Sequence, residues 1–116
     1  MSKLPEEYLK HILQEAGYLM SASSGLNVGD FLKDETRMRA FARSLEIIGE
    51  AVKMIPDEFR KLHPDVDWKA MAGMRNRLIH HYFGVDYEIV WDVIINEIPK
   101  LREQLQELIG ERLFEL

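Results

Sequence analysis

The stretch that decides the fold is DETRMRAFARSLEIIGEAVKMI, residues 34–55. Its apolar residues recur at steps of three and four, which is the spacing of one face of an α-helix. Its polar residues follow the same spacing on another side, so the stretch predicts a long amphipathic helix with one buried and one solvated face. The apolar stripe consists of Met38, Phe41, Ala42, Leu45, Ile48, Val52 and Ile55, and the polar face of Arg39, Arg43, Glu46 and Glu50.

The same periodicity continues on both sides of this stretch. Before it, apolar residues at three- and four-residue steps predict a helix that starts just after Pro5 and ends in SASSG, residues 21–25. After it, Pro56 and Pro64 bracket a segment with room for about two helical turns. No run alternates between apolar and polar residues for long enough to predict a strand. The chain is therefore expected to be all-α.

Two more long helices are expected in the second half of the chain. Asp67 is a suitable N-cap for a helix that Gly84 can end, because glycine tolerates the left-handed conformation found after many helices. Asp86 is a suitable N-cap for the last helix, in which Pro99 should produce a kink because it lacks a backbone donor. We therefore expect an up-and-down four-helix bundle with one extra short helix and a Pro-kinked C-terminal helix, in a single domain of residues 1–116.

The composition excludes several classes of protein. Apolar residues make up 47% of the chain, which is too many for a disordered protein. There is no cysteine, so neither a disulfide framework nor a thiolate metal site can form. The longest apolar runs are far too short to span a membrane, and acidic residues interrupt the N-terminal region where an export signal needs an unbroken apolar run. A cytoplasmic location is expected.

The charge is unevenly distributed. The net charge of −5 argues against broad, nonspecific affinity for nucleic acid. Residues 33–77, however, contain ten Lys or Arg against eight Asp or Glu, a balance of +2, whereas the rest has five basic and twelve acidic residues. The central segment fits either a local basic surface or an ordinary mixed-charge surface.

The segment MRNRLIHHYFG, residues 74–84, concentrates titratable groups within an expected helix. A metal site is disfavoured, because His80 and His81 would point about 100° apart on a helix. No H-E-x-x-H pattern supplies ligands one turn apart, and His11 and His63 are isolated in sequence. The glycine patterns of a nucleophilic serine elbow and of a phosphate-binding loop are also absent.

Acid–base chemistry on an RNA phosphodiester needs fewer groups. One imidazole can transfer the proton, and one planar guanidinium can stabilise charge on the phosphoryl oxygens. RNA carries its own nucleophile, the 2′-hydroxyl, so neither a metal nor an enzyme nucleophile is required. Arg75 and His80 supply these two groups. Composition alone favours the plainer interpretation, which is a polar face of a bundle helix.

The spacing of these residues matches a known family. Residues 75–82 read R-x-x-x-x-H-x-Y, and this motif resembles that of the HEPN superfamily, specifically the HepT-like toxins of HepT/MntA toxin–antitoxin systems. The similarity extends beyond the motif, from about residue 37 onward. The two blocks that carry it are RSLEIIGEAVKMIP, residues 43–56, and DWKAMAGMRNRLIHHYFGVDYEIVWDVI, residues 67–94.

This resemblance implies an all-helical homodimer that cleaves RNA without a metal or a cofactor, in a composite cleft between two subunits. It implies that Arg75 stabilises the transition-state phosphate and that His80 is the general base or acid. Asn76 would orient the site. Tyr82 would be the residue to which a partner MntA-like nucleotidyltransferase attaches AMP, which silences the toxin and would repel an RNA phosphate.

The expected helix raises a geometric difficulty for this site. Arg75 and His80 are five residues apart, which places them about 140° from each other around a continuous helix. A site shared between two subunits, or a helix that frays before Gly84, would remove the difficulty. Roles for Arg77 and His81 do not follow from the sequence.

Two other functions fit the same residues. The chain could be a non-catalytic helical scaffold or antitoxin that binds a minimal nucleotidyltransferase, which suits its acidic balance. It could also be a structural homodimer whose polar motif holds the interface. On the second helix, Arg43, Glu46 and Glu50 fit either a solvated face or a support that orients Arg75.

Overall fold

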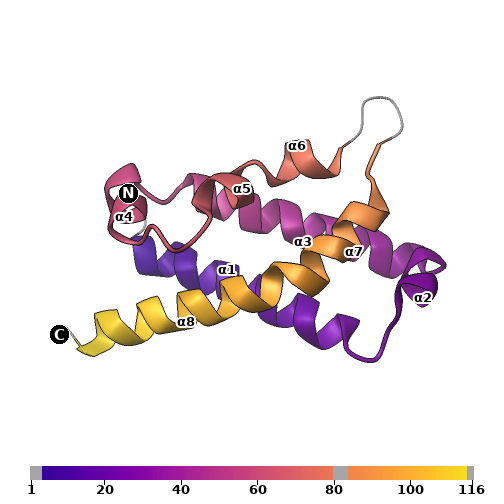
Figure 1. Cartoon of the computed structure of the whole chain (residues 1–116), viewed down its shortest axis with the longest axis horizontal. Coiled ribbons are helices and arrows are strands. Elements are labelled where there is room, and N and C mark those ends of the chain that lie inside the picture. The colour runs from indigo at the N-terminus through magenta and orange to yellow at the C-terminus, as the bar shows by residue number, and fades with distance from the viewer. Residues whose placement is uncertain (1–3, 80–83, 115–116) are drawn as a thin grey trace.

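The computed structural model describes residues 4–79 and 84–114, the last four of these as backbone only. This part of the chain is helical, and its only β-type pairing is an isolated antiparallel bridge between Ile79 and Val85. The all-α prediction is confirmed. The long helices are α1 (Pro5–Ser23), α3 (Glu35–Lys53), α7 (Tyr87–Asn96) and α8 (Ile98–Phe114), and the short ones are α2 (Val28–Leu32), α4 (Asp57–Leu62), α5 (Trp68–Ala72) and α6 (Met74–Leu78) (Figure 1).

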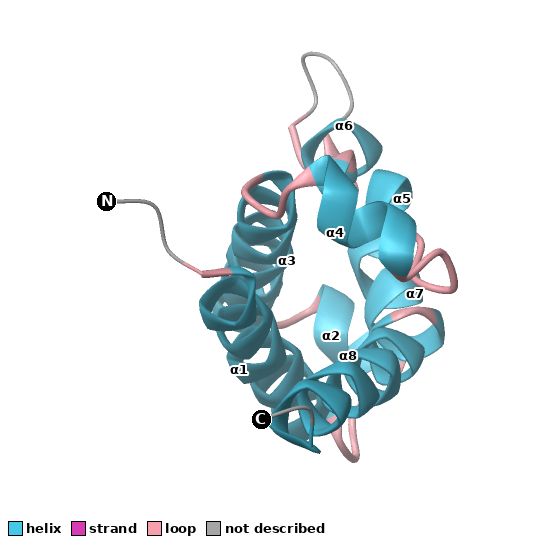
Figure 2. Ribbon diagram, turned by 90° about the vertical axis from the view of Figure 1, so that its left-hand side faces the viewer, coloured by secondary structure: helices cyan, strands magenta, loops and turns pink. Residues whose placement is uncertain are grey.

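The helices surround a common core. Seen nearly end-on, α1 and α3 form one side, α7 and α8 form the other, and α6 lies across the upper edge above α5 (Figure 2). Helix α3 packs against α1, α2, α5, α6 and α7, so most of the other helices contact it. None of the described helices combines the length and the apolar character needed to cross a membrane.

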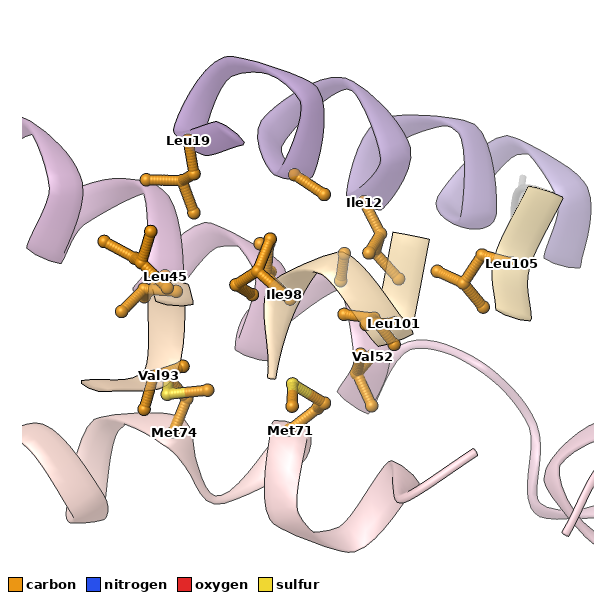
Figure 3. Close-up of a cluster of buried hydrophobic side chains, with 14 of the residues drawn as sticks. Ile12, Leu19, Leu45, Val52, Met71, Met74, Val93, Ile98, Leu101 and Leu105 are labelled. Carbon is orange, nitrogen blue, oxygen red and sulfur yellow. The ribbon is translucent and has the colours of Figure 1, made fainter. Parts of the chain in front are cut away.

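The apolar stripe predicted for residues 34–55 points into this core. All of its members are buried except Met38, which is half-buried. Fully burying such an aliphatic or aromatic side chain contributes about 1.5–3 kcal/mol. The stripe meets buried side chains from every side of the bundle, among them Ile12 and Leu19 of α1, Met71 and Met74 of α5 and α6, and Val93, Ile98, Leu101 and Leu105 of α7 and α8 (Figure 3).

Side-chain caps fix where the helices begin, as the sequence indicates. Helix α1 has Pro5 at its first position, where the missing N–H costs no hydrogen bond. Helices α3, α5 and α7 follow Asp34, Asp67 and Asp86, and each carboxylate accepts a backbone N–H from the first turn. The predicted caps at Asp67 and Asp86 are confirmed.

The prediction of one helix running through residues 68–83 is wrong. The chain forms two five-residue helices, α5 and α6, which meet at Gly73. Helix α6 ends at Leu78, because Ile79 is extended (φ −96°, ψ 126°) and pairs with Val85. The carbonyl of Leu78 accepts the N–H of Asp86 at 2.7 Å, so the helix stops at a tertiary hydrogen bond that periodicity does not reveal. Gly84 is left-handed (φ 74°), as predicted, but in the connection rather than at a helix end.

The predicted irregularity at Pro99 is confirmed as a break between α7 and α8. Proline cannot donate a hydrogen bond to the carbonyl four residues earlier and its ring clashes with that turn. The helical path is interrupted at Glu97 (φ −112°, ψ −38°) and resumes at Ile98. The break places Glu97 at the junction of two helix axes.

Helix α2 is an element that the sequence reading leaves within a loop. Its signal is a single N-cap, Asn27, whose side chain accepts the N–H of Asp30 at 2.8 Å. The helix places Phe31 in the core, where its ring stacks on that of Phe41. The centroid of the Phe31 ring lies 5.3 Å from that of Phe41 and 5.2 Å from that of Trp91. One turn of helix is too short for an apolar period to be visible in the sequence.

Gly49 lets α5 and α6 lie directly on α3. A Cβ atom at this position would stand 3.0 Å from the carbonyl oxygen of Met71 and 3.1 Å from the Cβ of Met74. We expect Gly49→Ala to lower the free energy of unfolding by about 1–3 kcal/mol, because two backbones would have to separate. Urea denaturation measures this.

The matched control for Gly49→Ala is Gly17→Ala, since Gly17 is also within a helix and a Cβ there would meet nothing within 4 Å. This control should gain roughly 0.5–1 kcal/mol, the usual difference between Ala and Gly in a helix. Equal effects of the two substitutions would contradict the close approach at Gly49.

Asp86 caps the start of α7, and its backbone N–H donates to the carbonyl of Leu78 at the end of α6. Its side chain accepts the N–H groups of Glu88 at 3.1 Å and Ile89 at 3.3 Å. Asp86→Ala should lower the free energy of unfolding by about 1 kcal/mol, as the loss of a cap usually does. Asp86→Asn keeps the acceptor oxygen and should be close to the parent in the same urea titration. An alanine variant as stable as the parent would show that the cap does not hold this junction.

Candidate functional site

Helix α6 carries the first polar residues of the motif, Arg75 and Asn76, at the upper edge of the bundle (Figure 2). Its residues Met74 and Leu78 are buried at 0% and 1% exposure and anchor it to the core. The helix contacts α3 on one side and α7 on the other (Figures 1 and 2). Because it has only five residues, its stability must come from these contacts rather than from its own hydrogen bonds. The direction of its polar side chains therefore depends on tertiary contacts.

Arg75 and Asn76 point away from the core, and both are exposed. Arg75 makes no hydrogen bond or ion pair with any residue that the structure describes, whereas every other arginine with a described side chain has such a partner. An exposed guanidinium without an internal anion is free to bind an external one, such as a phosphate. The arginines with partners are Arg37, Arg39, Arg43, Arg60, Arg77 and Arg102.

Arg77, only two residues further on, is held by Glu97. Its Nη1 donates to Oε1 at 2.9 Å and its Nη2 to Oε2 at 2.5 Å, which is a bidentate pair. The two side chains are 33% and 30% exposed, so the pair is partly shielded from water. The hydrogen bonds that Arg77 donates to Glu97 hold the pKa of the Arg77 guanidinium above its ordinary value, although burial opposes them. Arg77 is a fixed cation, and its pairing with Glu97 is a contact that motif spacing does not reveal.

The polar face of α3 behaves as a solvated surface. Arg43 and Glu46 pair with each other at 3.4 Å, and the Arg43 side chain is 67% exposed. Glu50 is exposed as well. Within the described part of the chain, no hydrogen bond joins any of these three to Arg75, so the interpretation of a solvated face fits and that of a direct support for Arg75 does not.

The predicted residues His80 and Tyr82, together with the unassigned His81, lie outside the described residues. The ends of the segment that contains them are described: Ile79 and Val85 pair across it. Because α6 ends at Leu78, the 140° separation expected for Arg75 and His80 on one continuous helix does not apply. Among the residues that the structure describes, no three His, Asp or Glu side chains are grouped closely enough to hold a metal ion.

Comparison with known proteins finds relatives along nearly the whole chain. A putative RNase of Caldanaerobacter subterraneus subsp. tengcongensis is 54% identical over 107 residues, which cover 92% of this chain and 96% of the relative. A putative RNase of Methanocaldococcus jannaschii is 43% identical over 104 residues, covering 90% and 86%. A probable ribonuclease HepT of Thermococcus cleftensis is 39% identical over 108 residues, covering 93% and 98%. No solved structure matches.

The family comparison agrees with these relatives. A sequence model described as Ribonuclease HepT-like matches residues 7–108, which include the core helices and the whole R-x-x-x-x-H-x-Y segment. The family resemblance inferred from the motif is thereby confirmed. The chain belongs to the HepT-like ribonuclease family.

Proposed function

We propose that this chain is a metal-independent endoribonuclease that acts as the toxin of a toxin–antitoxin system. The chain belongs to a ribonuclease family, and the observation that carries the proposal is that two arginines of α6 differ in their partners. Arg77 is bound by Glu97, whereas Arg75 is exposed and has no partner among the described residues. A site that must receive a phosphate needs one such uncommitted guanidinium.

The reaction is an internal transfer at phosphorus. The 2′-oxygen forms a bond to phosphorus, the bond from phosphorus to the 5′-oxygen breaks, and the products are a 2′,3′-cyclic phosphate and a 5′-hydroxyl. His80 accepts the proton of the 2′-hydroxyl or donates one to the 5′-oxygen. Arg75 stabilises the charge on the phosphoryl oxygens, and Asn76 orients the site. RNA as substrate is consistent with a cytoplasmic location.

A homodimer completes the site in this proposal. In a two-fold symmetric pair, each subunit presents the same surface to the other, so Arg75 and His80 each occur twice at the shared cleft. One copy of His80 can then act as base while the other acts as acid. The exposed position of α6 at the edge of the bundle leaves its outer side open to such a partner (Figure 2).

Tyr82 is the proposed control point. A partner MntA-like nucleotidyltransferase would join the phenolic oxygen to the α-phosphorus of ATP and release pyrophosphate. The attached AMP adds negative charge and bulk only seven residues after Arg75 in the sequence. Both would oppose the binding of an RNA phosphate.

Removal of either reacting group tests the nuclease. Purified protein should cleave a short single-stranded RNA in EDTA, and Arg75→Ala and His80→Ala should each lower kcat/KM by about 100-fold or more. Gel analysis of end-labelled RNA measures this, and the 3′ ends should carry a cyclic phosphate.

Two controls accompany this test. Lys61→Ala removes an exposed cation from α4 and should leave cleavage unchanged. An all-deoxy oligonucleotide of the same sequence should stay intact, because it lacks the nucleophile. Full cleavage by His80→Ala would refute the mechanism. No cleavage by the parent protein, with no toxicity on expression, would favour a non-catalytic scaffold for the nucleotidyltransferase.

Modification of Tyr82 is tested by intact-mass measurement. Incubation with an MntA-like nucleotidyltransferase and ATP should add one or more AMP units to the parent protein, none to Tyr82→Phe, and should abolish RNA cleavage. Tyr87→Phe, at the start of α7, is the matched control and should gain the same mass as the parent. Equal AMP addition to Tyr82→Phe would place the modification elsewhere.

A further inference from the structure

We propose that Glu97 is a positioning residue of the ribonuclease site and acts through Arg77. The inference rests on the proposed function, because it concerns the direction in which α6 presents Arg75. The bidentate pair joins residues that are 20 positions apart in the sequence, one on α6 and one at the α7–α8 junction. It joins two different elements, whereas the ion pairs of Arg37, Arg39 and Arg43 stay within α3 and its N-cap.

The geometry of α6 explains how the pair can act at a distance. Successive residues of a helix are separated by about 100°, so Arg75 and Arg77 lie about 200° apart and flank the buried stripe on opposite sides. Met74 and Leu78 hold the centre of that stripe in the core. The ion pair with Glu97 draws the side of α6 that carries Arg77 toward α7 and α8. It therefore sets the rotation of α6 about its axis, and the side that carries Arg75 faces toward α3.

Glu97 is suited to hold α6 in place because its own backbone is hydrogen-bonded to both neighbouring helices, α7 and α8. Its N–H donates to the carbonyl of Val93 at 2.9 Å, and its carbonyl accepts the N–H of Leu101 at 3.0 Å. Pro99, two residues later, produces the break at which Glu97 leaves the regular helical path. The backbone of Glu97 is therefore held by hydrogen bonds to both α7 and α8, whereas the five-residue helix α6 has little stability of its own.

The effect on the reaction should exceed the effect on stability. A pair that is about one-third exposed contributes little to folding, because water screens the charges. A displacement of about 1 Å in a reacting group, by contrast, can cost about 100-fold in rate. Arg77 keeps its charge when Glu97 is changed, because a guanidinium is not deprotonated at neutral pH, but it would lose its fixed direction.

The kinetic test uses Glu97→Gln, Arg77→Met and the double variant, at a temperature at which all are folded by circular dichroism. Each single variant should lower kcat about 10- to 100-fold with a change in KM of less than about threefold, and the double variant should lose no more than the worse single variant. Matched controls are Glu103→Gln, an exposed carboxylate of α8, and Arg37→Met, which removes an exposed ion pair of α3. Both controls should retain the parent kcat.

Amide hydrogen exchange tests whether the Arg77–Glu97 pair holds α6 in place, independently of catalysis. The N–H groups of Arg77 and Ile79 donate within and at the end of α6, so they report its opening. Their exchange should become about 5- to 10-fold faster in Glu97→Gln and in Arg77→Met, while the amides of α1 stay unchanged. Unchanged exchange in α6 would overturn the positioning role, whether or not the protein cleaves RNA.

The two hypotheses fail in different ways. If the parent cleaves RNA and Arg75→Ala does not, but Glu97→Gln keeps the parent kcat, the positioning role is wrong and the nuclease stands. If Arg75→Ala cleaves like the parent, the proposed site is wrong, and the exchange data alone decide whether Glu97 fixes α6.

Discussion

The buried stripe of α3 is the constraint on which the rest of the structure depends. Phe41, Leu45, Ile48 and Val52 are fully buried, and α1 from the start of the chain and α5, α6 and α7 from its second half all pack against α3. Gly49 lies on this helix at a point where α5 and α6 approach closely. The path of the chain after α5 follows from this contact, because α6 must bury Met74 and Leu78 within reach of α3.

The candidate site is a consequence of how a very short helix is held. Two arginines of α6 have the same chemistry and opposite environments, since one is bound by a carboxylate at the α7–α8 junction and the other faces solvent. In the proposed site, the bound arginine would restrict the helix and the exposed one would receive the ligand. Such a division of roles would let an acidic protein with a net charge of −5 offer a phosphate a favourable position. A single uncommitted guanidinium matters more at contact distance than the net charge, which is screened beyond about 10 Å.

Helix breaks give the site its geometry. Pro99 separates α7 from α8 and leaves Glu97 at the junction, while the pairing of Ile79 with Val85 ends α6 before the histidines. The arginine of the motif therefore lies on a helix, and the chain leaves that helix two residues before His80. The geometric difficulty that a continuous helix would impose disappears for this reason.

The sequence by itself determined the helical class, the long amphipathic helices, the caps at Asp67 and Asp86, the break near Pro99 and the R-x-x-x-x-H-x-Y motif. These features are local, because periodicity, capping and proline geometry act within one or two turns. The tertiary structure alone decided that α5 and α6 are separate, that α2 exists, and that Arg77 pairs with Glu97 while Arg75 does not. Each of these depends on contacts between residues far apart in the chain, and a local pattern carries no information about such contacts.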